Sequence, residues 1–189
     1  GSELDWAVFG KKLAQLHLIE GKFFGLDHDN YIGSLEQINK ECGAWSEFYT
    51  NHRLLNLTAK ARDKGFFEKK HCIWVEKLCQ RLDELIPACR PSLIHGDLWS
   101  GNLLIDTSGH PVLIDPAVYY GHPEMDWAML SLFGSYPVEA LDHYQNLHPL
   151  EKGLNERKDI HQLYPLMVHL ILFGKGYLNG VESTLKKYA

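Results

Sequence analysis

The chain has 189 residues, of which 45% are hydrophobic and 23% charged, and its formal net charge is −5. A chain of this length can bury one sizeable core, so we expect a single globular domain over residues 1–189. The modest negative charge and the lack of a long basic run argue against a nucleic-acid partner. No apolar run reaches the roughly 18 residues that a membrane span needs, so we expect no membrane partner.

The four cysteines, Cys42, Cys72, Cys79 and Cys89, show no C-x-x-C spacing. A zinc site therefore has little support from the sequence, although the chain has 11 histidines. Free thiols are typical of a reducing compartment, and no targeting sequence is visible. We therefore expect a cytoplasmic protein whose natural start lies upstream of residue 1.

The predicted elements are mostly helices around one hairpin. Apolar residues recur at helical spacing over residues 3–19, and a loop rich in Gly, Asp and Asn follows over residues 21–33. Two long helices come next, with Gly65 between them and Pro87 after the second. The helices expected beyond the first cover residues 44–62, 66–86, 123–133, 138–147 and 156–178.

The hairpin is predicted from two short β-prone runs, residues 102–106 and 111–115, which flank a turn that contains Gly109. Asn102 opens the first run and Asp115 closes the second. Because antiparallel strands place these two positions at the same end of the hairpin, we expect both side chains at one rim.

Chemistry is indicated by the spacing of Asp97, Asn102 and Asp115. A phosphotransferase uses this spacing for a base and two magnesium ligands. Asp97 could accept the proton of a substrate hydroxyl, while Asn102 and Asp115 offer the oxygen ligands that Mg²⁺ prefers. An isolated His-x-Asp is more often an ordinary turn, but here the Asn and the second Asp are both in register.

These motifs resemble those of the fructosamine kinase (ketosamine 3-kinase) family, which is related to aminoglycoside and choline kinases. The resemblance rests on residues 95–102, 114–117 and 120–124. Weaker similarities lie upstream, at residues 13–17, 24–26, 30–33 and 45–49. Aminoglycoside kinases share the His-Gly-Asp and the Asn, but the Trp-Ser-Gly and Tyr-Gly-His stretches are closer to fructosamine kinases.

The resemblance implies a protein-kinase-like fold of the α+β class, mainly α, with one short catalytic β-hairpin. It implies an ATP-dependent kinase that phosphorylates the 3-hydroxyl of a small-molecule or protein-bound fructosamine, with ATP and Mg²⁺ as cofactors. In such an enzyme Asp97 would be the catalytic base, and Asn102 and Asp115 would be the metal ligands. An aminoglycoside- or choline-kinase-like phosphotransferase is the alternative.

Two further residues are expected to support the catalytic loop. By the resemblance, His95 fixes the loop and carries no proton; the alternative is a half-buried histidine without a role in chemistry. Asp126 would accept hydrogen bonds from amides of the catalytic loop. It could instead be a plain helix cap, because an acidic residue is favourable near a helix amino end in any case.

Trp99, Tyr120 and His122 are the candidate substrate-binding residues. Trp99 follows the base by two residues and could present a flat apolar face to a sugar or an amine substituent. A buried core tryptophan is the alternative. Tyr120 and His122 could line the same pocket or only pack the loop after Asp115.

A complete kinase of this type also needs a glycine-rich loop and a strand lysine that bind the phosphates of the nucleotide. The sequence has no G-x-G-x-x-G. We therefore expect a C-terminal lobe without its N-terminal nucleotide lobe, and negligible activity of the chain by itself. The non-enzymatic alternative is a catalytically incompetent lobe that keeps its acidic site but lacks the nucleotide clamp.

Overall fold

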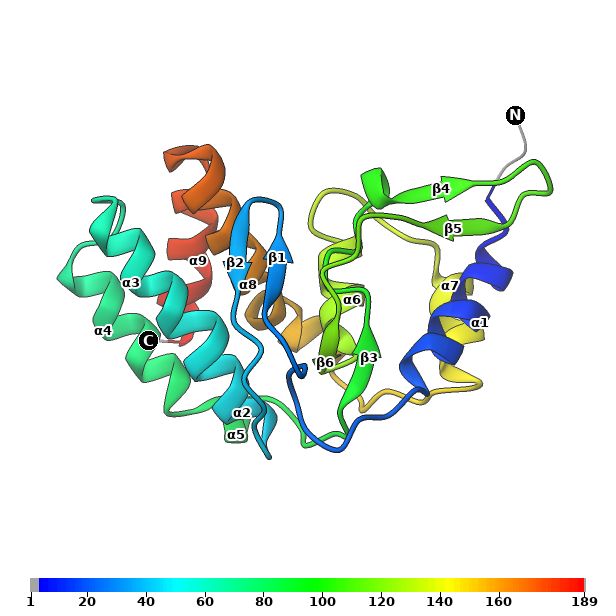
Figure 1. Cartoon of the computed structure of the whole chain (residues 1–189), viewed down its shortest axis with the longest axis horizontal. Coiled ribbons are helices and arrows are strands. Elements are labelled where there is room, and N and C mark those ends of the chain that lie inside the picture. Colours follow the sequence, from blue (N-terminus) through cyan, green and yellow to red (C-terminus); the bar gives the residue numbers. More distant parts are fainter. Residues whose placement is uncertain (1–3, 189) are drawn as a thin grey trace.

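The computed structural model describes residues 4–188 and shows a mainly helical chain with three two-stranded antiparallel sheets (Figure 1). The sheets pair β1 with β2, β3 with β6, and β4 with β5. The strands are β1 (Asn30–Ile32), β2 (Leu35–Gln37), β3 (Ser92–Ile94), β4 (Leu103–Ile105), β5 (Pro111–Leu113) and β6 (Tyr119–Gly121). The α-helices are α1 (Trp6–His17), α2 (Trp45–Phe48), α3 (Leu55–Asp63), α4 (Lys69–Cys79), α5 (Leu82–Leu85), α6 (Glu124–Leu130), α7 (Val138–Gln145), α8 (Leu154–Phe173) and α9 (Leu178–Tyr188).

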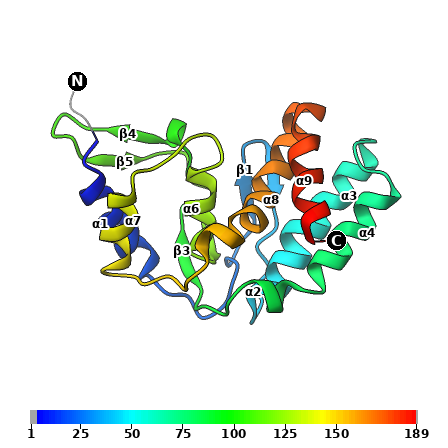
Figure 2. The ribbon, with the colours of Figure 1, turned by 180° about the vertical axis from the view of Figure 1, so that it is seen from behind.

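The buried apolar side chains form two clusters. The larger one packs α2, α3, α4, α8 and α9 together, and the smaller one packs α1 and α7 against α6. Figures 1 and 2 show α3, α4 and α9 at one end of the molecule and α1 and α7 at the other, with the β1–β2 and β3–β6 pairs and α6 between them. The β4–β5 hairpin extends from this middle region toward α1, so the predicted catalytic residues, which lie after β3 and at the near end of the hairpin, belong to the middle region.

The first predicted helix is confirmed as α1, and residue 3, where we expected it to begin, lies outside the described residues. The helix starts after Asp5, whose carboxylate accepts a hydrogen bond from the Val8 N–H at 2.9 Å. A Cβ at Gly10 would lie only 2.1 Å from the Ala140 carbonyl oxygen. Glycine at this position therefore lets α1 and α7 approach backbone to backbone.

The prediction of one helix over residues 66–86 is wrong, because α4 and α5 share this segment. At the start, the Glu68 N–H donates to His71 Nδ1 at 2.8 Å, which fixes the first turn at Lys69. At the other end, Arg81 leaves the helical region (φ −112°, ψ 1°), and buried Leu82 begins α5.

Two other boundaries also differ from the predictions. The last expected helix, over residues 156–178, ends at Phe173 because Gly174 adopts a φ of 95°, and α9 then runs on to Tyr188. The segment 21–33, expected to be a loop, contains β1 and forms a hairpin with β2. The expectation of a single hairpin is therefore wrong.

The remaining elements agree with the predictions. The segment 44–62 is helical, with a π-helical stretch, Tyr49–Leu54, between α2 and α3. Helices α6 and α7 lie within the predicted ranges, and β4 and β5 form the predicted hairpin. All four cysteines are free thiols. No helix among residues 4–188 is long and apolar enough to cross a membrane.

Candidate active site

Asp126, in the first turn of α6, bonds to the backbone at the start of the catalytic loop, residues 95–102. Its carboxylate accepts hydrogen bonds from the backbone N–H groups of His95 (2.7 Å) and Gly96 (2.9 Å), and it contacts His17 Nε2 at 3.1 Å. Asp126 and His17 are fully buried, so these bonds form away from water. Burial alone would raise the pKa of Asp126, but the hydrogen bond from His17, the nearby histidines and the Gly96 N–H together outweigh burial and lower it. These are the contacts to loop amides that the sequence predicts.

His95 joins the catalytic loop to the segment that follows β5. Its Nε2 donates to the Ile114 carbonyl oxygen (2.9 Å), and its Nδ1 accepts from the Asp97 N–H (3.3 Å). One ring nitrogen therefore donates a hydrogen bond and the other accepts one. Because the buried ring uses both nitrogens on the backbone, His95 has none left to carry a proton to a substrate. This geometry corresponds to the predicted support role.

Asp97 lies at the front of the same loop and is partly buried. Asn102 Nδ2 donates to the Asp97 carbonyl oxygen (2.9 Å) and to its carboxylate Oδ2 (3.2 Å). Burial raises the pKa of Asp97, while His95, His169 and the Asn102 hydrogen bond oppose that rise. A carboxylate with a raised pKa accepts a proton more readily, which suits a general base.

Asn102 and Asp115 meet at one end of the β4–β5 hairpin. Leu103 pairs with Leu113, and the Ile114 N–H donates to the Asn102 carbonyl oxygen at 3.1 Å. Asn102 uses Nδ2 on Asp97, which leaves its Oδ1 for another partner. The Asp115 carboxylate is exposed and has no hydrogen bond or ion pair among residues 4–188. One carboxylate and one amide oxygen form a donor set that fits Mg²⁺.

The catalytic loop and the loop after β5 touch through their backbones. A Cβ at Gly96, which has a φ of 82°, would lie 2.1 Å from the Ala117 carbonyl oxygen. The Ala117 N–H also donates to the His95 carbonyl oxygen at 2.9 Å. In the loop after β5, Asp115 has a φ of 48° and is the only non-glycine residue with a positive φ within residues 4–188. The loop that carries this strained residue is therefore in backbone contact with the catalytic loop.

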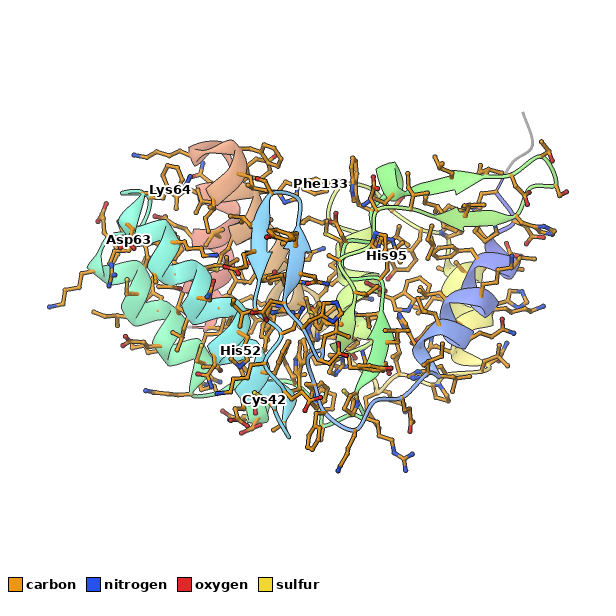
Figure 3. All side chains as sticks on the ribbon, in the orientation of Figure 1. Cys42, His52, Asp63, Lys64, His95 and Phe133 are labelled. Carbon is orange, nitrogen blue, oxygen red and sulfur yellow. The ribbon has the colours of Figure 1, made fainter. Side chains whose placement is uncertain are left out.

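Trp99 belongs to an open aromatic cluster next to the base, which it forms with Phe133, His169, Phe173 and Tyr177. Trp99 is 38% exposed, so the alternative of a buried core tryptophan is wrong. The cluster lines a hollow of about 300 Å³, in which Phe133 meets the rings of Trp99 (6.3 Å between centroids) and His169 (4.8 Å). In Figure 3, Phe133 lies between the β1–β2 hairpin and the catalytic loop that contains His95.

Sequence reasoning found only Trp99 of this cluster. A signal for three others was present, because His169, Phe173 and Tyr177 recur at intervals of four residues, the spacing of one helical face. His169 also lowers the pKa of Asp97, as a secondary influence after burial, which places the cluster within electrostatic reach of the base.

Tyr120 and His122 do not join Trp99. Strand β6 runs antiparallel to β3, with Tyr119 opposite Ile94 and Gly121 opposite Ser92. Asp97 follows the Ile94 end of this pair and His122 follows the Gly121 end, so the two residues lie beyond opposite ends of the ladder. Tyr120 packs its ring on Gly21, where a Cβ would lie 2.6 Å away.

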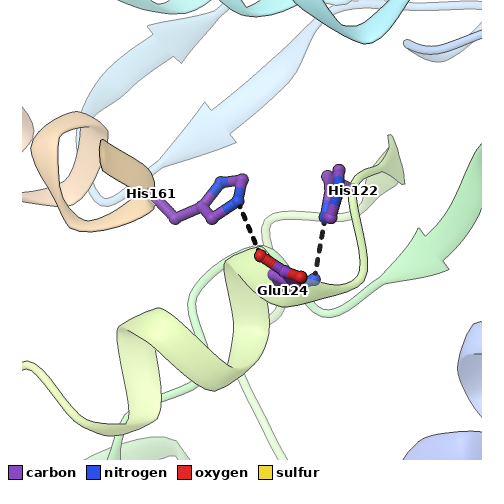
Figure 4. Close-up of side chains that lie close together, drawn as sticks. All are labelled: His122, Glu124 and His161. Carbon is purple, nitrogen blue, oxygen red and sulfur yellow. Dashed lines mark hydrogen bonds and ion pairs between the residues drawn. The ribbon is translucent and has the colours of Figure 1, made fainter. Parts of the chain in front are cut away.

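His122 lies instead in a buried polar cluster with Glu124 and His161 (Figure 4). Their ligand-type atoms lie within 4.8 Å of one another, and His161 Nε2 is 3.2 Å from Glu124 Oε2. Arg157 donates to both Glu124 oxygens, at 3.0 and 2.5 Å. Burial alone would raise the pKa of Glu124, but the hydrogen bonds from His161 and Arg157 lower it to about 2. The carboxylate is thus already neutralised, and the cluster ties α8 to α6.

Comparison with known proteins identifies the family. The fructosamine kinase family matches residues 1–189. A probable ketoamine kinase of Lactiplantibacillus plantarum is 40% identical, over 98% of this chain and 70% of its own length. A probable ketoamine kinase of Synechocystis is 39% identical, over 99% of this chain and 63% of its own. The chloroplastic protein-ribulosamine 3-kinase of Arabidopsis thaliana is 36% identical, over 100% of this chain and 58% of its own.

Solved structures agree with these matches. The crystal structure of a putative fructosamine-3-kinase from Thermobifida fusca has a TM-score of 0.91 and 40% identity, over 96% of this chain and 63% of that one. An ADP-bound aminoglycoside phosphotransferase has a TM-score of 0.53 at 14% identity, over 96% of this chain and 62% of that one, which supports the shared kinase-like fold alone.

The chain therefore spans less than two thirds of the length of several relatives, although their matches cover nearly all of this chain. The expectations of an absent nucleotide lobe and an inactive isolated chain gain no support from these matches and stay predictions. What the geometry and the matches establish together is that this chain belongs to the fructosamine kinase family.

Proposed function

We propose that the protein is an ATP- and magnesium-dependent kinase that phosphorylates the 3-hydroxyl of a ketosamine, free or attached to a protein. The observation that carries this proposal is the convergence of Asp97, Asn102 and Asp115 where β3 and the β4–β5 hairpin end, beside the aromatic cluster. We also propose that residues 1–189 act as one domain that holds the catalytic loop and the substrate side of the site.

Asp97 is the catalytic base in this proposal. Its partial burial raises its pKa, and its hydrogen bond from Asn102 orients the carboxylate toward the front of the loop. The carboxylate would accept the proton of the 3-hydroxyl as the oxygen attacks the γ-phosphate. Asp126 and His95 act on the substrate only through the loop, because their polar atoms are used on backbone groups.

Asn102 Oδ1 and the Asp115 carboxylate would hold magnesium, and magnesium would neutralise charge on the phosphates during transfer. The outer face of the same hairpin supports nucleotide binding. Leu104 pairs with Val112 across the strands, and these side chains are 48% and 41% exposed. Cross-strand partners lie on one face of a sheet, so Leu104 and Val112 form an apolar platform for a planar base, and Leu104 is two residues from Asn102.

The aromatic cluster would bind the amine end of the substrate. In a ketosamine the nitrogen is attached to C1, two carbons from C3, so the amine lies close to the base when the 3-hydroxyl does. This nitrogen is a cation at neutral pH, and aromatic faces attract cations. In this proposal Trp99 and Phe133 are the substrate-contacting residues nearest to Asp97, and Phe173 and Tyr177 lie farther along the amine substituent.

An aminoglycoside- or choline-kinase-like activity is the second candidate. It is favoured by the kinase-like fold shared with aminoglycoside phosphotransferases. Aminoglycosides carry several amines and call for several carboxylates around the acceptor. The aromatic cluster, in contrast, is lined by Trp99, Phe133, His169, Phe173 and Tyr177, and no carboxylate among residues 4–188 lines it. This lining favours a ligand with a single amine and an alkyl arm.

Phosphate transfer from radiolabelled ATP tests the proposal. The full-length protein is offered fructosyl-lysine, ribosyl-lysine, an aminoglycoside and choline at saturating Mg²⁺. We expect transfer to the two ketosamines, with kcat/KM at least tenfold above that for the other acceptors, which corresponds to about 1.4 kcal/mol of discrimination. Transfer to the aminoglycoside or choline alone would replace the ketosamine assignment with the second candidate.

A further inference from the structure

Arg53 is a buried cation without a carboxylate partner. Its side chain is 0% exposed, and no ion pair involves it among residues 4–188. The guanidinium carbon lies 4.5, 4.1 and 5.2 Å from the ring centroids of Phe48, Tyr119 and Tyr164. Burying an unpaired charge is unfavourable. The burial of Arg53 therefore calls for an explanation, which its hydrogen bonds provide.

One contact of Arg53 starts a directional chain of hydrogen bonds. A guanidinium can only donate, so Asn39 must turn its Oδ1 to Arg53 NH2 (2.8 Å). Asn39 Nδ2 then donates to Asn30 Oδ1 (2.8 Å), and Asn30 Nδ2 donates to the Val118 carbonyl oxygen (2.8 Å). The fixed polarity of Arg53 thus sets the orientation of two amides and delivers a donor to the loop after Asp115.

A second branch ends on the neighbouring carbonyl. The Tyr164 hydroxyl donates to Gln37 Oε1 (2.8 Å), so Gln37 must present its Nε2 on the other side. This Nε2 donates to the Ala117 carbonyl oxygen (3.1 Å) and to Asn30 Oδ1 (2.8 Å). Gln37 is 1% exposed, so water cannot replace these bonds.

The two branches act on the loop that carries Asp115, the strained residue described above. His95 Nε2 fixes Ile114 on one side of Asp115, and the two amide donors fix Ala117 and Val118 on the other. Backbone strain of this kind persists only where surrounding contacts hold it in place. The strained turn is thus held on both sides, by residues from distant parts of the chain.

We propose that Arg53, Asn39, Asn30 and Gln37, the amide brace, are positioning residues that hold Asp115 in the geometry for binding a divalent cation. The proposal rests on the proposed function, because it takes Asp115 to be a metal ligand. The brace also explains the β1–β2 hairpin, which carries Asn30 and Gln37 to the loop.

A matched pair of substitutions tests the brace in the 189-residue chain. Gln37→Glu keeps the size of the side chain and an acceptor for Tyr164, but removes the donor to Ala117. Gln162→Glu is the control, because Gln162 is also buried (9% exposed) and its Nε2 donates to the Ala128 carbonyl oxygen (2.9 Å), away from the Asp115 loop. Asn30→Asp, at a less buried position, is the second variant should Gln37→Glu fail to fold.

Two measurements apply to each variant: hydrogen exchange at the Ala117 amide, and the affinity for Mn²⁺ from paramagnetic broadening of the loop signals. We expect Gln37→Glu or Asn30→Asp to speed exchange and weaken Mn²⁺ binding by about fivefold to tenfold, the effect of losing the one hydrogen bond that each residue donates to a loop carbonyl. Gln37→Glu also loses its bond to Asn30 Oδ1. Gln162→Glu should leave both values within about twofold, even if it lowers the melting temperature as much.

The brace is refuted if the folded variants keep wild-type exchange and Mn²⁺ affinity, or if the control changes them equally. Failure of the wild-type chain to bind Mn²⁺ would count against the metal assignment in the proposed function. In that case the exchange rates at Ala117 still decide whether the amide donors hold the loop.

Discussion

The catalytic loop has a buried side, the rear, and an open side, the front. The two sides differ in whether their polar groups have hydrogen-bond partners within the protein. At the rear, Asp126 and His95 are buried, and each side chain bonds to backbone groups of the site. At the front, Asp97 is only partly buried, Asp115 is exposed without a partner among the described residues, and Trp99 is 38% exposed.

This difference separates two tasks. The rear bonds hold the backbone in one geometry, so they stabilise the fold whether or not a ligand is bound. The front leaves a carboxylate, an amide oxygen and aromatic faces free, and such groups gain partners only when ligands arrive. Substitutions at the rear should therefore affect stability first, and substitutions at the front should affect activity first.

Asp126→Ala should have the largest effect, on stability. The change leaves two buried loop N–H groups and the His17 ring without their shared partner. We expect the free energy of unfolding to fall by about 3–5 kcal/mol, as for other buried charges that lose a partner. Urea denaturation measures it, with Asp159→Ala, a half-exposed ion-paired position, as the control. A loss below about 1 kcal/mol would show that the loop does not depend on Asp126.

Asp97→Ala should have the next largest effect, on catalysis alone. Loss of the base should lower kcat in the full-length protein by on the order of 10²-fold or more, equivalent to about 2.7 kcal/mol. Its urea midpoint should change far less than that of Asp126→Ala. Turnover within about tenfold of the wild type would remove Asp97 from the mechanism.

The pH profile of the wild-type enzyme provides a further check on Asp97. Because burial raises the pKa of Asp97, the base should become protonated at a higher pH than an ordinary aspartate as the solution is acidified. We therefore expect kcat/KM to be full above this pKa and to fall tenfold per pH unit below it. An acid limb at or below the ordinary aspartate pKa would contradict the assignment.

Asp115→Asn should weaken metal binding and leave the ketosamine site intact. Replacing the carboxylate with a neutral amide removes the only charged oxygen of the proposed pair. We expect the half-saturating Mg²⁺ concentration to rise by about tenfold, with a smaller change in KM for the ketosamine. Magnesium dependence that stays at the wild-type value would rule out Asp115 as a ligand.

Trp99→Ala should have the smallest effect and act on substrate binding. It removes one aromatic face and no group near the phosphates, so KM for the ketosamine should rise about fivefold, or roughly 1 kcal/mol, while slow ATP hydrolysis is retained. Trp74→Ala, whose ring packs near Lys186 away from the site, is the control. Equal loss of both activities would mean that Trp99 supports the fold.

Sequence reasoning succeeded where the signal was local. The β4–β5 hairpin follows from two β-prone runs and a glycine turn, and Asp126 follows from its place in the first turn of a helix. The juxtaposition of Asn102 and Asp115 follows from hairpin register, because antiparallel strands must bring the two residues to the same end.

It failed where distant contacts decide the structure. Strands β1 and β2 have three residues each, too few for an alternating pattern, and they are held by the bonds of Asn30 and Gln37 to the loop after Asp115. Tyr120 and His122 follow the metal loop closely in sequence, but the extended β6 carries them away from the site. The end of α8 could have been found from Gly174 and Gly176.

The close approach of Gly96 to Ala117 joins the loop that carries Asp97 to the loop that carries Asp115 through their backbones. The proposed base and the proposed metal ligand therefore lie on two segments that are in direct main-chain contact. Under the proposed function, changes to Phe133, Phe173 or Tyr177 should alter which amine is accepted while the geometry of phosphoryl transfer stays the same. Substrate selectivity should therefore be open to redesign independently of the proposed chemistry.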